Sequence, residues 1–174
     1  MTQDTLTTDL SDAHEGALQY LAPGYQDFGG HGRFHGPAKT LLTFEDNTKV
    51  RAAVETPGEG RVLVVDGAGS MNCALFGGNL AKLAADNGWA GIVIHGCVRD
   101  QAELKAEAVG IKALASHPKK SEKRDLGTYD EVLEFSGVTI RPGDYIYADE
   151  DGVVIGRAYL ELAGYGGGLG ARLN

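Results

Sequence analysis

The chain has 174 residues, 43% of them hydrophobic and 23% charged, which suits a single globular domain with a core of its own. Lys and Arg number 16 against 24 Asp and Glu, which gives a formal net charge of −8. That balance argues against direct binding to nucleic acid, because such binding needs a basic face.

The N-terminal sequence MTQDTLTTDL has neither the basic nor the apolar segment of a secretion signal. No apolar run approaches the roughly 20 residues of a membrane-spanning helix. We therefore expect a cytoplasmic protein with no membrane partner. Cys73 and Cys97 lack the spacing of a zinc finger or of a CxxC motif, and we expect them to be reduced thiols.

The first third of the chain predicts a helix, a loop, a strand and a second helix. Residues 7–20 carry apolar residues at helical spacing, which predicts the first helix. Residues 23–37 contain five glycines and two prolines, which predicts a loop. A strand is expected over residues 38–44. The helix that follows should have Asn47 as its N-cap and end before Pro57.

The middle of the chain predicts two parallel strands joined by a helix. Residues 62–65 and 91–96 are apolar and rich in β-branched side chains, as in strands that are covered on both faces. Between them, residues 79–87 place leucines on one side of a helix, and Gly88 suits its C-terminal end. A helix between two such strands implies a parallel crossover. Another short helix is expected over residues 100–108.

The character of the sequence changes after Lys119. Short β-prone runs alternate with the turn sequences RPGD and EDG, which predicts antiparallel hairpins. The expected fold class is therefore α/β, with a parallel centre and an added antiparallel β layer. We expect one domain over residues 1–160, followed by a glycine-rich flexible tail over residues 161–174.

The stretch VVDGAGS, residues 64–70, resembles nucleotide-binding loops. In the dinucleotide fingerprint GxGxxG, Gly67 and Gly69 fit, but Asn72 takes the place of the third glycine. The glycine loop of S-adenosylmethionine methyltransferases is also similar, but it needs an acidic residue at the end of the next strand, where His95 stands here. A tight turn after a strand is the simpler interpretation.

Three histidines are candidate ligands. His31 and His35 have an H-x3-H spacing, which binds a metal when both lie on one face of a helix. The surrounding GGHGRFHG cannot form a stable helix, so a role in a loop is favoured. His95 ends a buried strand beside the candidate site described next, where a contact with substrate and a structural role are both open.

Two pairs of residues suggest a site. Gly77 and Gly78 precede a helix, whose first N–H groups lack intrahelical partners and can bind a carboxylate. Arg99 and Asp100 follow the end of a strand, where open α/β sheets place ligands. Arg99 offers a planar fork to a carboxylate or an enolate, and Asp100 offers oxygen ligands to Mg²⁺ or Mn²⁺. Together they could hold a 2-oxo acid, whereas a surface salt pair is the alternative.

Five stretches with a specific order and spacing resemble one protein family. They are DFGGHGRFHG, RVLVVDGAGS, LFGGNLAKLAADNGWAGIVIHGCVRD, ALASHPKKSEK and SGVTIRPGDYIYADEDGVVI, and they span most of residues 9–155. By them the chain is identified as a member of the family of regulator of ribonuclease activity A and the metal-dependent 4-hydroxy-4-methyl-2-oxoglutarate aldolases.

The resemblance implies a three-layer β/β/α swivelling-domain fold and a ring-shaped homotrimer with sites near subunit boundaries. It implies cleavage of 4-hydroxy-4-methyl-2-oxoglutarate to two pyruvates, and decarboxylation of oxaloacetate, both through a pyruvate enolate. Matched to the family motif, Arg99 is the arginine that contacts substrate, Asp100 is the ligand of Mg²⁺ or Mn²⁺, and Glu103 is an acid behind that ligand. The amides that hold the pyruvate carboxylate match Gly77, Gly78, Asn79 and Leu80.

This sequence departs from the aldolases at Gly78, where they usually place a carboxylate that assists the water shell of the metal. Asn79 is neutral and could replace that carboxylate only in part. We therefore expect a weakened metal site that depends on Asp100, and decarboxylation that is better preserved than aldol cleavage.

The same family contains proteins that bind and inhibit ribonuclease E through the assembled ring, without catalysis. A protein-binding regulator of this kind is the alternative function, and an acidic surface suits a basic partner. The Arg99–Asp100 pair favours the enzyme, because a regulator has no need of it, whereas Gly78 favours the regulator.

Overall fold

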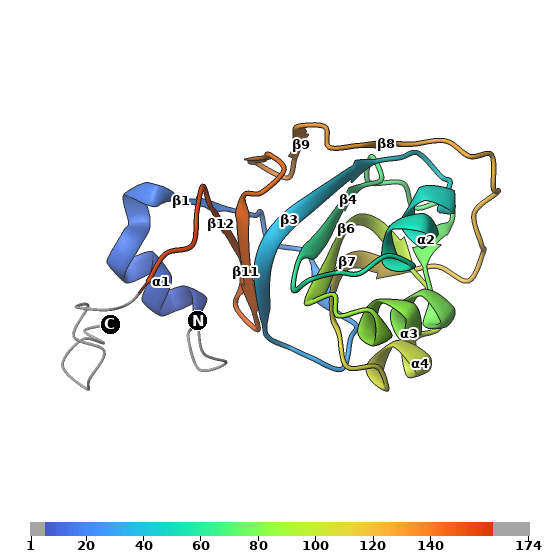
Figure 1. Ribbon diagram of the computed structural model, residues 1–174, viewed down its shortest axis with the longest axis horizontal. Coiled ribbons are helices and arrows are strands. Elements are labelled where there is room, and N and C mark those ends of the chain that lie inside the picture. The colour runs from blue at the N-terminus through green and yellow to red at the C-terminus, as the bar shows by residue number, and fades with distance from the viewer. Residues whose placement is uncertain (1–5, 162–174) are drawn as a thin grey trace.

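Four parallel strands organise the molecule (Figure 1). The structure is a computed structural model that describes residues 6–161. In spatial order the parallel strands are β3 (Phe34–Leu42), β4 (Val62–Asp66), β6 (Gly91–Val98) and β7 (Gly110–Ser116). The predicted parallel crossover between β4 and β6 is confirmed, and α3 (Gly78–Asp86) lies within it.

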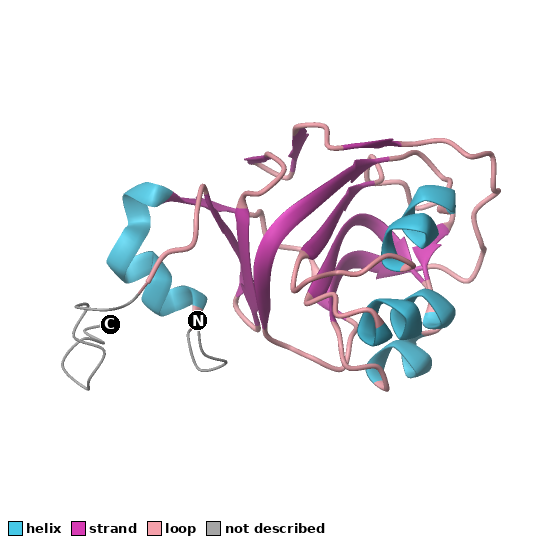
Figure 2. Ribbon diagram, viewed as in Figure 1, coloured by secondary structure: helices cyan, strands magenta, loops and turns pink. Residues whose placement is uncertain are grey.

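Three short helices cover one face of these strands (Figure 2). They are α2 (Thr48–Val54), α3 and α4 (Gln101–Lys105). Their apolar residues, such as Val54 and Leu80, share a core with Leu63 and Ile92 of the sheet. Because strands β4 and β6 are covered on both faces, they are apolar at almost every position, as the sequence predicted.

Antiparallel strands extend the sheet beyond β3 and cover its other face. They are β11 (Tyr145–Asp149), β12 (Gly152–Gly156) and β1 (Leu18–Tyr20), which pair in that order outward from β3. A separate hairpin of β9 (Leu133–Phe135) and β10 (Val138–Ile140) joins them over the core that contains Val64 and Val93. The α/β class with a parallel centre and an antiparallel β layer is confirmed, as is the β/β/α arrangement.

The expected helix over residues 7–20 is wrong in its second half. Helix α1 ends at His14 (Thr7–His14), a 3-10 turn follows (Glu15–Ala17), and the chain then forms β1. The residues of β1 pair with β12, with Leu18 opposite Gly156, so a distant strand overrides the local helical pattern.

The expected loop over residues 23–37 is also wrong in part. It contains β2 (Gln26–Asp27), which pairs with β7, and the first residues of β3. Phe34 is buried against the starts of β6 and β7, where a Cβ on Gly91 or Gly110 would overlap its ring. Burial of this aromatic ring therefore draws a glycine-rich segment into the sheet.

Three strands were missed altogether. Strands β5 (Ala74–Phe76) and β8 (Thr128–Tyr129) are short and pair with β6 and β3. Strand β7 was obscured by Lys112 in its middle. Lys112 is 3% exposed, and its Nζ donates to the Asp149 carbonyl at 2.7 Å and lies 3.1 Å from the Asp27 carboxylate. A buried lysine of this kind depends on partners that the local sequence does not reveal.

Three further expectations from the sequence concern membrane spans, the two cysteines and the C-terminal tail. No helix among residues 6–161 is long and apolar enough to cross a membrane. Cys73 and Cys97 are both buried and free of disulfide bonds. The predicted flexible tail falls, apart from Glu161, outside the described residues.

A buried carboxylate fastens the start of α2 to a distant loop. Asn47 is the N-cap residue, as predicted, but the capping carboxylate belongs to Asp46. Its Oδ1 accepts the Thr48 amide at 2.8 Å and the Thr48 hydroxyl at 2.6 Å, and its Oδ2 accepts the amides of Arg124 and Leu126 at 2.7 and 3.0 Å. Burial alone would raise the pKa of Asp46, but these hydrogen bonds hold the pKa well below its ordinary value.

We predict that Asp46→Asn lowers the free energy of unfolding by about 2 kcal/mol at pH 7, because an amide cannot accept all four hydrogen bonds. The folded pKa of Asp46 lies below its unfolded value of about 3.9, so the stabilisation is complete above that value and is lost as the pH falls further. Urea unfolding at pH 7 and below pH 4 measures this. The exposed Asp130→Asn is the control, and a difference from wild type that stays constant with pH would contradict the prediction.

Candidate functional site

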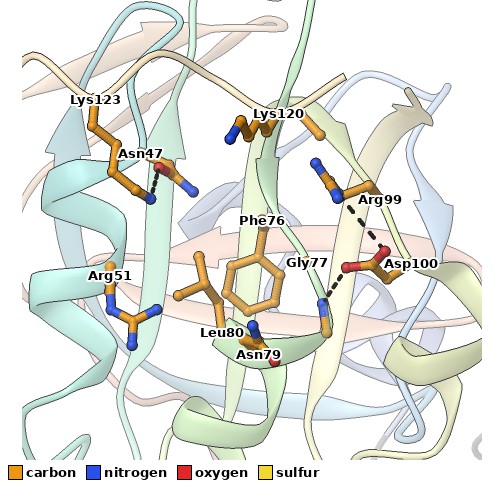
Figure 3. A pocket seen from close by; sticks show the side chains of 12 residues that line it. Asn47, Arg51, Phe76, Gly77, Asn79, Leu80, Arg99, Asp100, Lys120 and Lys123 are labelled. Atoms are coloured by element: carbon orange, nitrogen blue, oxygen red, sulfur yellow. Dashed lines mark hydrogen bonds and ion pairs between the residues drawn. The ribbon is translucent and has the colours of Figure 1, made fainter. Parts of the chain in front are cut away.

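The end of β6 and the start of α3 meet at one place, as the sequence predicted (Figure 3). Directly after β6, the Arg99 amide donates to the Phe76 carbonyl at 2.9 Å. Asp100 then adopts a left-handed backbone, with φ of 63°, and its Oδ2 accepts the Gly78 amide at 3.0 Å. These two bonds hold the Arg-Asp pair against the glycine pair.

A cavity of about 170 Å³ lies at this junction. Phe76 and Leu80, both buried, form an apolar part of its wall. All but one of the predicted site residues line it: Gly77, Gly78, Asn79, Leu80, Arg99 and Asp100. The exception is Glu103, which is placed behind the wall in α4.

Four further polar residues line the cavity that the sequence did not indicate. Asn47 and Arg51 come from the start and middle of α2, and Lys120 and Lys123 come from the segment after β7. The two lysines belong to the basic run KKSEKR, which was the one hint in the sequence of a positive surface here. That run is too short and too interrupted to suggest RNA binding. On a chain of net charge −8, the cavity is lined by four cationic side chains and by one carboxylate. The site therefore suits an anionic ligand.

The Asp100 carboxylate has two kinds of neighbour. Its Oδ2 accepts the Gly78 amide, and its Oδ1 lies 3.7 Å from Arg99 Nε. The side chains of Arg99 and Asp100 are 36% and 35% exposed, so both can reach a ligand in the cavity. Each carboxylate oxygen has a further lone pair for a metal.

The amide set that was expected to hold a substrate carboxylate is smaller than predicted. Since the Gly78 amide donates to Asp100, it is already engaged. Intrahelical bonding of α3 begins with the Ala81 amide, which donates to the Gly77 carbonyl at 3.0 Å. The amides of Asn79 and Leu80 come before that bond and lie at the positive end of the helix dipole. These two remain for a bound carboxylate.

Glu103 fills the space that a side chain at position 78 would need. A Cβ on Gly78 would overlap Glu103 Oε2, and a Cβ on Gly77 would come within 2.7 Å of Asp100 Oδ2. The glycine pair therefore makes room for the carboxylates of Asp100 and Glu103, two residues that follow the C-terminal end of β6. The space beside Gly78 is therefore occupied by the Glu103 carboxylate.

The donor set fits a hard divalent cation rather than zinc. No group of three or more His, Cys, Asp or Glu side chains that could hold a metal occurs within residues 6–161. A structural zinc site needs such a group. Mg²⁺ and Mn²⁺ accept one or two carboxylates when water and substrate oxygens complete the octahedron, which Asp100 with Glu103 behind it can supply.

The histidines play no part in this cavity. His35 lies in β3, where its Nδ1 is 2.8 Å from the Tyr145 hydroxyl. His95 has its Nδ1 2.8 Å from the Tyr25 hydroxyl and its ring stacked on Phe135, and burial raises the pKa of Tyr25 to about 12. His95 thus joins three segments of the fold, which supports the structural interpretation.

The loop VVDGAGS folds back onto the end of β6. The amides of Gly67 and Gly69 both donate to the His95 carbonyl, at 3.1 and 3.0 Å. Amides that are engaged in this way cannot also bind the phosphates of a nucleotide. The loop is a tight turn, as the simpler interpretation held.

The comparisons with known proteins agree with this architecture. The RraA-like family model, described as Aldolase/RraA, matches residues 7–155. A protein of Alkalilimnicola ehrlichii is 56% identical over 157 residues, which cover 90% of this chain and 98% of that protein. One of Cupriavidus necator is 55% identical, over 86% of this chain and 94% of that protein. Both carry the name "Putative 4-hydroxy-4-methyl-2-oxoglutarate aldolase".

Two solved structures share the fold with a TM-score of 0.88 each. One, from Geobacillus kaustophilus, is named an S-adenosylmethionine: 2-dimethylmenaquinone methyltransferase and is 47% identical, covering 90% of this chain and 97% of that one. The other, from Thermus thermophilis, is named the RNA-processing inhibitor RraA and is 46% identical, covering 91% and 96%. These names differ in function although the folds agree.

We predict that Gly78→Ala lowers the free energy of unfolding by roughly 1–3 kcal/mol, because the new methyl group overlaps the Glu103 side chain. The double variant with Glu103→Ala should recover most of that loss, which would show that the two positions are coupled. Gly16→Ala is the matched control, since a Cβ there meets no atom within 4 Å. Thermal unfolding of the wild type, these three variants and the single variant Glu103→Ala tests this, and additive losses in the double variant would contradict it.

Proposed function

The chain belongs to the RraA-like family, and from that premise and the geometry of the cavity we propose that it is a divalent-metal-dependent carbon–carbon lyase acting on 2-oxo acids. The proposed substrates are 4-hydroxy-4-methyl-2-oxoglutarate, by aldol cleavage, and oxaloacetate, by decarboxylation. The expected homotrimer and cytoplasmic location belong to the same proposal.

One observation carries the proposal: Asp100 joins the start of α3 to a cavity that Arg99 also lines. A purely structural cap on α3 needs a carboxylate but no neighbouring guanidinium that faces a cavity. A 2-oxo acid calls for positive partners, because its carboxylate and its keto oxygen lie side by side and each carries or gains negative charge. The helix amides and Arg99 supply partners for those two oxygen groups.

The proposed roles follow from where each group lies. The amides of Asn79 and Leu80 bind the carboxylate next to the keto group. Arg99 binds the keto oxygen, on which negative charge develops as the carbon–carbon bond breaks. Asp100 would hold Mg²⁺ or Mn²⁺, which supplies Lewis-acid polarisation of the keto group when bound. Glu103 adds a second negative charge behind Asp100, at the position of the trailing acid in the family motif.

The Glu103 carboxylate occupies the space beside Gly78. The carboxylate that the aldolases usually carry at position 78 is still absent, so decarboxylation should be better preserved than aldol cleavage. Groups that are placed in advance against developing charge are worth about 3 kcal/mol each, or on the order of 100-fold in rate.

A second candidate function is a protein-binding regulator of ribonuclease E. One solved relative at 46% identity is named an RNA-processing inhibitor, and the net charge of −8 suits a basic partner. Such a function would use the outer surface and would not need the cavity. The two functions are compatible with one chain.

We predict that Asp100→Asn lowers the rate of pyruvate release from either substrate by about 100-fold, and that a chelator does the same to the wild type. Asp86→Asn, on the exposed side of α3, is the control and should leave the rate unchanged. Because Asp100 also caps α3, Arg99→Ala serves as a second variant that leaves this cap in place. If neither the chelator nor Arg99→Ala changes the rate of pyruvate release, the proposed chemistry is refuted.

The regulator is tested on the same variants. Inhibition of purified ribonuclease E, measured as the rate of RNA cleavage, should be equal for wild type and Arg99→Ala if the outer surface is responsible. A loss of inhibition that parallels the loss of lyase activity would show that regulation depends on the cavity instead.

A further inference from the structure

The cavity continues past the proposed binding site for the keto acid. Arg51 of α2 and Lys123 lie on one side, and Arg99 lies on the other with Asp100 (Figure 3). The apolar side chains of Phe76 and Leu80 lie between the two sides. A ligand that spans the cavity therefore meets positive charge at both ends and an apolar surface in the middle.

The Arg51 guanidinium is oriented so that it can bind an anion. Its Nε donates to Glu55 Oε1 at 2.8 Å, one helical turn further on, which holds the guanidinium in place. Within the described residues this leaves the two terminal nitrogens for a ligand. In the same part of the chain, residues 6–161, Lys123 makes only a long contact, with its Nζ 3.5 Å from Asn47 Oδ1. The Arg51 side chain is 47% exposed, so a ligand that binds there need not displace a buried partner.

We propose that Arg51, assisted by Lys123, binds a second carboxylate at the distal end of the substrate and so gives the enzyme a preference for doubly anionic 2-oxo acids over monoanionic ones. This proposal rests on the proposed function, which places the keto acid at the Arg99 end. A planar guanidinium binds a carboxylate through two parallel hydrogen bonds, which makes Arg51 the better discriminating group and Lys123 a supporting charge.

In aldol cleavage the distal carboxylate stays on the fragment that contains C4. The C4 hydroxyl gives its proton to water, and the C3–C4 bond breaks. The electron pair of that bond forms the enolate of pyruvate, which takes up a proton from water at C3. The C4 fragment leaves as a carbonyl compound that retains the distal carboxylate. Arg51 therefore selects reactions whose second product is a 2-oxo acid rather than a simple aldehyde.

A pair of substrates that differ only at the distal end tests this selection. 4-Hydroxy-2-oxoglutarate ends in a carboxylate, and 4-hydroxy-2-oxopentanoate has a methyl group in its place. Arg51→Gln should raise KM for the first by roughly 10-fold or more with little change in kcat, and should leave the second within about 2-fold. Arg51→Lys should recover part of the loss.

The matched control is Lys82→Gln on α3, which also removes a cation from an exposed (i, i+4) ion pair but does not line the cavity. It should leave both substrates unchanged. If Arg51→Gln affects the two substrates equally, or neither, while the wild type cleaves them, the distal site is wrong and the proposed lyase stands.

If no cleavage is detected, a binding measurement tests the distal carboxylate site independently of the proposed lyase activity. Calorimetric titration with 2-oxoglutarate and with 2-oxopentanoate, in the presence of Mg²⁺, compares a diacid with a monoacid of equal length. The wild type should bind the diacid roughly 10-fold more tightly, and Arg51→Gln should remove that preference. Equal affinity of the wild type for both acids would overturn the distal site whatever the activity.

Discussion

The hydrogen bond between the Asp100 carboxylate and the Gly78 amide fixes the geometry on which the site depends. Asp100 adopts a left-handed backbone, which costs energy for a residue other than glycine, and its side chain recovers some of that cost at the positive end of α3. Because Arg99 is anchored to Phe76 one residue earlier, the same turn aims a guanidinium and a carboxylate at one cavity.

The charged side chains around the cavity are also arranged by the meeting of β6 with α3. Two glycines at the start of α3 make room for the carboxylates of Asp100 and Glu103, while Arg51 of α2 and Lys123 of the segment after β7 line the opposite side of the cavity (Figure 3). Asp46 holds that segment to α2 through the Arg124 and Leu126 amides. A buried carboxylate outside the cavity thus fixes the loop that brings Lys120 and Lys123 to it, on a chain that is acidic overall.

The sequence predicted the parts of this arrangement that local patterns control. Apolar runs predicted β4 and β6, and the leucines and Gly88 predicted α3, so the meeting of Gly78 with Asp100 could be foreseen. The sequence could not reveal strands β7 and β1, because the buried Lys112 and the pairing of Leu18 with Gly156 depend on distant partners. Arg51 was missed for the same reason, since nothing in its own helix shows that it faces a site on α3.

Crystals grown with Mn²⁺ and oxalate, a planar analogue of the pyruvate enolate, would test the central claim most directly. The anomalous signal of manganese should lie roughly 2.0–2.2 Å from an Asp100 oxygen. The oxalate should lie between that ion, Arg99 and the amides of Asn79 and Leu80. A manganese ion bound elsewhere, with Asp100 contacting only the Gly78 amide, would show that this carboxylate is a helix cap and that the cavity is not the site of a metal-dependent lyase.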